Sequence, residues 1–260
     1  MSFRDAGWVW EGQGLDPGVF PSIFGVGEGA NYFGVSHAVY IFHPNDDLAM
    51  RKLGHLRGVV CDISKWKFRR TPDGGTQNWV DAAPATVLAE AQNVGRLSRS
   101  YPHVVGAFHD DMLGLVKREN YGPEDYARVY HALKEANPKL KLWVVVYTHE
   151  LGDPLWQSFS PFIDVVNLWV WEAKNLPRLE EELARCRQVF PGKPVNVGCY
   201  LRDYPTAAPV PMPLLKGQWE CVLRQYERGT IEGYSILGSV LIDGHQEQAN
   251  WVREFIAAHS

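Results

Sequence analysis

The 260-residue sequence contains only four cysteines, and no two of them form a C-x-x-C pair. Zinc sites and disulfide frameworks depend on characteristically spaced cysteines, so neither is indicated. We predict that Cys61, Cys186, Cys199 and Cys221 are reduced thiols in the core. A chain of this length can bury enough apolar surface to fold without covalent or metal cross-links.

Long apolar runs and blocks of one charge are also missing. No run reaches the roughly 18 apolar residues of a membrane span, and the N-terminus lacks the apolar segment and cleavage site of a signal peptide. With 26 basic and 30 acidic residues, the formal net charge is −4. These features predict a cytoplasmic protein that binds neither membranes nor nucleic acid, although a secreted protein without its signal would look the same. The oligomeric state is not indicated.

Several catalytic motifs are absent. The sequence has no G-x-S-x-G nucleophile elbow, no phosphate-binding Walker loop and no H-E-x-x-H metal motif. The glycines of residues 25–29 lack the G-x-G-x-x-G spacing of a dinucleotide-binding loop. We therefore predict no bound metal and no cofactor.

The sequence does contain a regular succession of short apolar segments and amphipathic stretches. Most apolar segments are continuous, which is typical of strands buried on both faces of a parallel sheet. The predicted strands are residues 8–10, 38–42, 58–63, 104–108, 142–147, 163–171, 195–200 and 234–242. The clearest helices are predicted at residues 85–98, 123–136, 176–189, 214–226 and 246–258.

Eight strands with helices between them predict an α/β fold, a single (β/α)8 (TIM) barrel over residues 1–260. No linker or change in composition divides the chain. Residues 12–36 are rich in glycine and show no clear amphipathic pattern, so we expect a long loop after the first strand, with at most a short helical turn near residues 17–24. The second strand–helix unit is also short, with room for a helix only at residues 45–53. Because these first two units depart from the regular repeat, an open doubly wound sheet is the alternative.

Polar side chains gather at the carboxyl ends of the predicted strands, which form one rim of a (β/α)8 barrel and hold its active site. The fourth strand ends in His109, Asp110 and Asp111. Burying a carboxylate costs several kcal/mol unless it is paired or hydrogen-bonded. Two in succession therefore indicate a catalytic role, and the alternative is that one of them caps the next helix.

The sixth strand ends in Trp169 and Trp171, followed at once by Glu172. Aromatic faces pack against the C–H faces of sugar rings, and carboxylates bind sugar hydroxyls. The alternative is that both indoles pack inside the barrel or against its helices. Five of the ten tryptophans fall at or just beyond a predicted strand end, namely Trp8, Trp10, Trp66, Trp169 and Trp171.

The other strand ends supply further candidates, which are Glu11, Asp62, Tyr147, His149, Glu150, Tyr200 and Asp203. For His149 and Glu150 the simpler explanation is an exposed loop, and for Asp203 an ion pair within its loop. Lys65 follows the third strand. It could bind an acidic group, but we predict a solvated lysine.

Residues 106–111 and 169–172 resemble the strand ends of (β/α)8 glycoside hydrolases. The α-galactosidase and polygalactosaminidase kinds likewise place one catalytic carboxylate after strand four and another after strand six. The resemblance implies a glycosidase in which Asp110 is the nucleophile or base and Glu172 the general acid. Asp111 would bind a hydroxyl or tune the pKa of Asp110, and Glu150 is the reserve acid. The seventh strand departs from the common plan of retaining β-glycosidases, because it ends in Tyr200 instead of a glutamate.

The implied partner is a saccharide or glycoside substrate. The predicted substrate-binding residues are Tyr147, Trp169, Trp171, Tyr200, His109, His149, Asp203, Glu11 and Asp62. Two other functions remain open. One is a metal-dependent sugar isomerase, epimerase or lyase, in which histidines and carboxylates hold a divalent ion. The other is a carbohydrate-binding barrel without catalysis.

Overall fold

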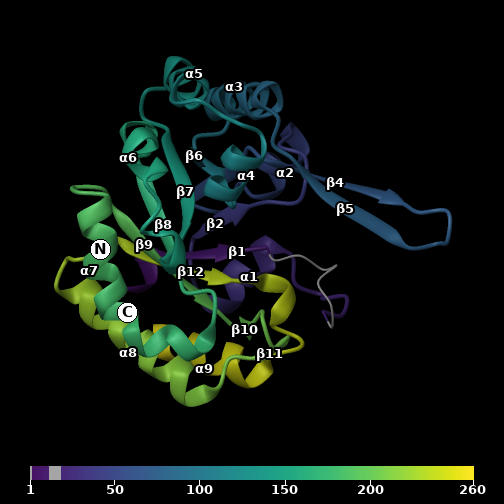
Figure 1. Cartoon of the computed structure of the whole chain (residues 1–260). Helices are drawn as coiled ribbons and strands as arrows, with labels where there is room; N and C mark the ends of the chain where they lie inside the picture. Colours follow the sequence, from purple (N-terminus) through teal and green to yellow (C-terminus); the bar gives the residue numbers. More distant parts are fainter. Residues whose placement is uncertain (1, 12–18) are drawn as a thin grey trace.

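A computed structural model describes residues 2–11 and 19–260. Eight parallel strands close into a barrel in the order β1-β12-β9-β8-β7-β6-β3-β2 (Figure 1). They are β1 (Gly7–Trp10), β2 (His37–Tyr40), β3 (Gly58–Asp62), β6 (Val104–His109), β7 (Lys141–Tyr147), β8 (Val165–Trp169), β9 (Val195–Tyr200) and β12 (Gly233–Leu237). The predicted (β/α)8 barrel is confirmed, and the alternative of an open sheet is wrong.

Helices follow most strands and cover the outside of the barrel (Figure 1). The longer ones are α3 (Pro84–Ser100), α5 (Pro123–Ala136), α7 (Leu179–Val189), α8 (Met212–Glu227) and α9 (Gln246–Ala258), and the shorter ones are α2 (Asp47–Lys52), α4 (Met112–Arg118) and α6 (Leu155–Phe159). Helix α5 shows why the predicted bounds hold. Pro123 occupies its first turn, Asp125 accepts a hydrogen bond from the Gly122 N–H, and Tyr126, Val129 and Leu133 form its buried face.

The segment after β1 contains a helix, α1 (Val26–Phe33). The prediction of a loop throughout residues 12–36 is therefore wrong over this stretch. Its glycines obscure the helical pattern because they are points of close contact: a Cβ on Gly29 would lie 2.5 Å from the Cβ of Ser239. Residues 12–18 lie outside the described residues, and residues 19–24, the described part of the expected turn, form no helix.

Two hairpins were not predicted. Strands β4 (Lys65–Arg70) and β5 (Thr76–Asp81) pair antiparallel after β3 and project away from the barrel (Figure 1). Strands β10 (Arg202–Asp203) and β11 (Ala208–Pro209) form a shorter pair after β9. The sequence does carry a signal for the first hairpin, since Asp-Gly-Gly at residues 73–75 is a typical turn between strands.

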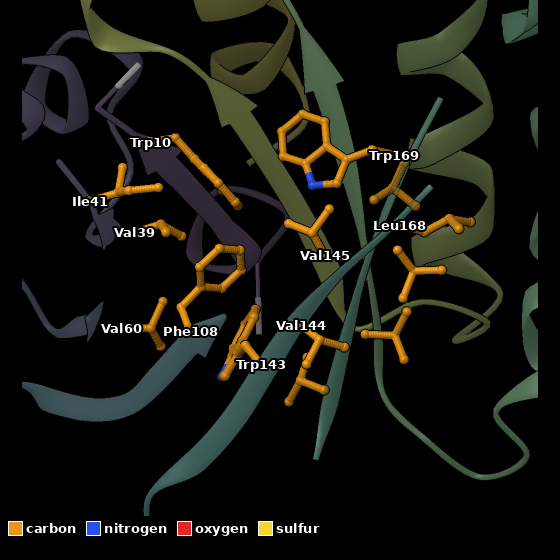
Figure 2. Packing of buried hydrophobic residues seen from close by; sticks show 14 of the residues in the cluster. Trp10, Val39, Ile41, Val60, Phe108, Trp143, Val144, Val145, Leu168 and Trp169 are labelled. Atoms are coloured by element: carbon orange, nitrogen blue, oxygen red, sulfur yellow. The ribbon is translucent and has the colours of Figure 1, made fainter. Parts of the chain in front are cut away.

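The inside of the barrel is filled with aromatic and aliphatic side chains (Figure 2). Trp10 packs edge-on against Phe108 and Trp169, with ring centroids 4.5 and 5.2 Å apart. Val60 and Val145 are fully buried beside them. The four cysteines are buried and free, as predicted. This packing fills the barrel interior, so the strand ends remain the place for a site.

Gly198 on β9 provides the space that the Trp169 ring occupies. A Cβ on Gly198 would lie 2.0 Å from Cδ2 of Trp169, and this ring is held between Trp10 and Tyr200. We expect Gly198→Ala to lower the free energy of unfolding by about 3 kcal/mol, because the buried indole has to shift. Urea denaturation followed by circular dichroism measures this.

The matched control is Gly217→Ala in the middle of α8, where the added Cβ meets no atom within 4 Å. It is expected to raise the free energy of unfolding by about 0.5 to 1 kcal/mol through helix propensity. Equal stability of Gly198→Ala and the wild type would contradict the tight packing of Trp169.

Candidate active site

A cavity of about 640 Å³, which includes space open to solvent, lies at the carboxyl ends of the barrel strands. We call it the mouth cavity. Its lining residues are Trp10, Ile41, Phe42, Trp66, Asp110, Asp111, Val145, Tyr147, Trp169, Trp171, Tyr200, Tyr204 and Leu237. It therefore brings together six predicted site residues, which are Asp110, Asp111, Tyr147, Trp169, Trp171 and Tyr200. Two lining residues were not among the predicted site residues. They are Trp66, one of the tryptophans near a predicted strand end, which lies in β4, and Tyr204, which directly follows β10.

Asp110 and Asp111 follow β6 directly and both line the mouth cavity. Asp111 precedes α4 with φ of +46°, in the left-handed region, where a non-glycine residue is strained. Its side chain makes no capping hydrogen bond to the helix. The carboxylate accepts a hydrogen bond from Tyr147 Oη at 2.8 Å instead. The alternative that Asp111 serves as a helix cap is therefore not supported.

The surroundings of these aspartates favour their protonated forms. Burial raises the pKa of Asp110 well above its usual value, and the charges of Asp111 and Asp62 raise it further. A hydrogen bond from the Trp66 side chain opposes this rise. Burial also raises the pKa of Asp111, while the hydrogen bond from Tyr147 lowers it. Adjacent carboxyls with raised pKa values are suited to proton transfer near neutral pH.

Asp62, at the end of β3, lies behind the mouth cavity and does not line it. It is 2% exposed and accepts hydrogen bonds from the backbone N–H and the hydroxyl of Ser64, at 3.0 and 2.8 Å. The Asp110 N–H also donates to the Asp62 carboxylate. Burial raises the pKa of Asp62 to about 7, against the opposing charge of Lys65. Asp62 thus holds the Asp110 backbone through a hydrogen bond, and its charge raises the pKa of the Asp110 carboxyl.

Lys65 is buried, so its prediction as a solvated lysine is wrong. Its Nζ donates to the Asp62 carbonyl oxygen at 2.9 Å and lies 3.4 Å from the Glu90 carboxylate of α3. The physical reason is the unpredicted hairpin, because β4 begins at Lys65 and places its side chain between β3 and α3.

Aromatic rings form one wall of the mouth cavity. Trp171, 37% exposed, stacks on Tyr204 with ring centroids 5.4 Å apart and an interplanar angle of 21°. Its ring also meets Tyr147 edge-on at 5.6 Å. Trp169 is 1% exposed and packs on Tyr200 at 4.5 Å. Trp169 is therefore mainly part of the barrel core, and Trp171 offers the accessible indole face.

A second cavity, of about 810 Å³, adjoins the mouth cavity, and we call it the side cavity. The two cavities share Asp111, Tyr147 and Trp171. The side cavity also contains Arg118, His149 and Glu150, together with Gly114 and Leu115. Glu150 accepts a hydrogen bond from the Tyr147 N–H at 3.2 Å, and burial raises its pKa. The predicted reserve acid thus lies beside the mouth cavity and not inside it.

Three other predicted carboxylates do not line the mouth cavity. Glu172 pairs with Lys174 Nζ at 2.6 Å, because β8 ends at Trp169 and the chain has left the barrel by residue 172. Asp203 accepts hydrogen bonds from the Ala173 N–H and the Thr206 hydroxyl, which brace two loops. Glu11 pairs with His43 at 3.1 Å beside a separate cavity.

His109 lies on the other side of β6 from the mouth cavity. It is fully buried and stacks on Tyr126 of α5, with Nδ1 3.4 Å from the tyrosine hydroxyl. Burial lowers its pKa to about 3, so the imidazole is neutral. This placement does not support its predicted contact with substrate.

Within residues 2–11 and 19–260, no three His, Cys, Asp or Glu side chains are arranged to hold a metal ion. The metal-dependent alternative therefore gains no support from a ligand cluster. Likewise, none of the described helices has the length and apolar character needed to cross a membrane.

Neither a protein-family model nor a curated protein sequence matches this chain. Its structure is similar to solved structures of glycoside hydrolases. A β-D-glucuronidase of Dictyoglomus thermophilum has a TM-score of 0.61 at 11% identity, covering 98% of this chain and 50% of that one. A family 18 chitinase of Crocus vernus has a TM-score of 0.55 at 11% identity, covering 97% and 98%.

A β-galacturonidase of Eisenbergiella tayi, solved with bound galacturonate, has a TM-score of 0.59 at 12% identity, covering 99% of this chain and 51% of that one. This chain thus spans about half the length of the glucuronidase and the galacturonidase. At these identities the likeness shows the fold, a parallel eight-stranded barrel that these glycoside hydrolases share.

Proposed function

We propose that this chain is a glycoside hydrolase that acts at the mouth cavity. One observation carries the proposal: two adjacent aspartates with raised pKa values open into an aromatic-walled cavity at the carboxyl end of a (β/α)8 barrel. The similarity in fold to a glucuronidase and a chitinase agrees with it.

Cleavage of a glycosidic bond needs a proton donor for the leaving oxygen and a carboxylate that attacks the anomeric carbon or activates water. We assign proton donation to Asp110, because burial and two neighbouring carboxylates favour its protonated form. Asp111 is the ionised partner, since its charged form accepts the hydrogen bond from Tyr147. These roles differ from the sequence-based assignment, in which Glu172 donates the proton.

Trp171 and Tyr204 would form the platform for the sugar ring, with Tyr147 and Tyr200 completing the wall. The side cavity would admit the water that Asp111 activates or that later hydrolyses the glycosyl intermediate, because Asp111 lines both cavities and Asp110 lines only the mouth cavity.

The Tyr147 hydroxyl is expected to set the pH range of activity. Its hydrogen bond lowers the pKa of Asp111, so Tyr147→Phe lets that pKa rise. Activity that needs ionised Asp111 is lost as the pH falls through this pKa. The acidic limb of the profile of kcat/KM against pH should therefore move upward by about one pH unit. An unmoved acidic limb would exclude Asp111 as the ionised group.

The proposed function is tested by incubating the purified protein with a panel of aryl α- and β-glycosides and oligosaccharides. Hydrolysis that Asp110→Asn removes is the expected result. Sugar binding without hydrolysis, followed by tryptophan fluorescence, would instead favour a carbohydrate-binding barrel. Activity that EDTA abolishes and a divalent ion restores would favour the metal-dependent alternative.

A further inference from the structure

The charged side chains that line the mouth cavity are all acidic. Among the described residues that line it, Asp110 and Asp111 are charged and the others are aromatic or aliphatic. Asp62 adds a third carboxyl group directly behind Asp110, close enough for its charge to act on that residue. A ligand in this cavity therefore meets hydroxyls, rings and negative charge.

Within the described part of the chain, no basic side chain lines the mouth cavity. Lys65 binds Glu90 and the Asp62 backbone, and Lys174 pairs with Glu172 outside the cavity. The guanidinium of Arg202 lies 6.0 Å from the ring of Tyr204 and lines a different cavity.

Residues 12–18, which lie outside the described residues, cannot supply a basic side chain either. Their sequence is Gly-Gln-Gly-Leu-Asp-Pro-Gly, without lysine, arginine or histidine. The lack of a cation at the mouth cavity therefore does not depend on where this segment lies.

We propose that the mouth cavity selects a sugar ring without a carboxylate, so that neutral hexoses are accepted and uronic acids are rejected. The inference rests on the proposed function and specifies its substrate class. A uronate would place a negative charge beside Asp110 and Asp111 in a half-buried site, where water screens poorly. No described basic side chain lines this cavity, and Arg118 lines only the adjoining side cavity. Catalysis requires at least one of these aspartates to be ionised, so the repulsion is present in the active protein.

A structural neighbour with the same fold was solved with an acidic sugar, whereas the mouth cavity of this chain favours neutral sugars. The Eisenbergiella tayi β-galacturonidase shares the barrel fold and was solved with galacturonate. The acidic mouth of the present chain points to a different class of sugar on a similar scaffold. Fold likeness alone would not separate the two classes.

The test uses pairs of 4-nitrophenyl glycosides that share configuration and leaving group, namely glucoside with glucuronide and galactoside with galacturonide, in both anomers. We expect kcat/KM for the better neutral substrate to exceed that of its uronide by at least about 100-fold, the order expected for one uncompensated charge in a partly buried site. Comparable or faster hydrolysis of the uronide would overturn the inference.

A binding measurement separates failure of this inference from failure of the proposed function. Quenching of tryptophan fluorescence is titrated with glucose against glucuronate and galactose against galacturonate. Binding of a neutral sugar without hydrolysis of any glycoside would refute the hydrolase but uphold the selection. Equal or tighter binding of the uronate, or binding of neither sugar, would overturn it.

A charge-swap variant tests the cause of the selection. Phe42 lines the mouth cavity outside the proposed sugar platform, so Phe42→Lys places a cation on the mouth wall and Phe42→Gln is its uncharged control. We expect Phe42→Lys to shift the ratio of uronate to neutral-sugar binding toward the uronate by about tenfold, while Phe42→Gln leaves it within about threefold. An equal ratio in both variants would show that charge is not what selects the sugar.

Discussion

Asp110→Asn is expected to lower kcat/KM for glycosides with poor leaving groups by at least about 1,000-fold. The amide has nearly the same shape as the carboxyl group but cannot donate the catalytic proton. The 2,4-dinitrophenolate group needs little protonation as it leaves, so Asp110→Asn should lower kcat/KM for a 2,4-dinitrophenyl glycoside much less. Initial rates on aryl glycosides of graded leaving-group pKa measure this difference, which a purely structural role would not produce.

Two further variants sharpen this result. Asp111→Asn should lose activity on all leaving groups, because the ionised partner is needed whatever leaves. Glu172→Gln should remain within about threefold of the wild type, since Glu172 pairs with Lys174 outside the mouth cavity. A large loss in Glu172→Gln with little loss in Asp110→Asn would favour the assignment made from sequence over the one proposed from the cavity.

Asp62→Asn is expected to flatten the dependence of stability on pH. In the unfolded chain this carboxyl titrates near 3.8, whereas burial raises its pKa in the folded protein to about 7. Between these values the folded state keeps a proton that the unfolded state has lost. The contribution to stability is therefore full below pH 4 and is lost as the pH rises to 7, and it amounts to about 4 kcal/mol.

Urea denaturation of the wild type and Asp62→Asn at pH 4.5, 6 and 8 measures this contribution. The free energy of unfolding of the wild type should fall more steeply with pH than that of the variant. Asp110 and Asp111 remain in both proteins, so the difference reports the titration of Asp62 together with the part of the Asp110 pKa shift that the Asp62 charge causes. The amide oxygen can still accept from Ser64. Equal slopes would contradict a raised pKa for Asp62.

Much of the fold could be predicted because the barrel repeats one local pattern. Each buried parallel strand is a short continuous apolar segment, and α5 follows from a proline start and apolar residues on one face. The exceptions have local causes. The glycines of α1 conceal its amphipathic pattern, and the strands of the β4–β5 hairpin pack largely outside the barrel, so they lack a continuous apolar segment.

The candidate site was only partly predictable. Asp110 and Asp111 stand out because two carboxylates directly follow a buried strand, and Trp171 because it follows another. Glu172 also follows a buried strand closely, but where its side chain lies depends on the path of the chain after β8 ends at Trp169. Trp66 and Tyr204 come from hairpins that periodicity does not reveal.

The sequence by itself determined the barrel, the order of its strands along the chain and the concentration of carboxylates and aromatic residues at one rim. Only the tertiary structure decided which of these side chains share a cavity, which pair with lysines and which carboxyl groups have raised pKa values. The reason is physical. Strand and helix patterns depend on residues close in sequence, whereas burial and charge interaction depend on distance in space. The pKa of Asp110, for example, is raised by burial, by the charge of Asp111, and also by that of Asp62, which lies 48 positions earlier in the chain and on a neighbouring strand.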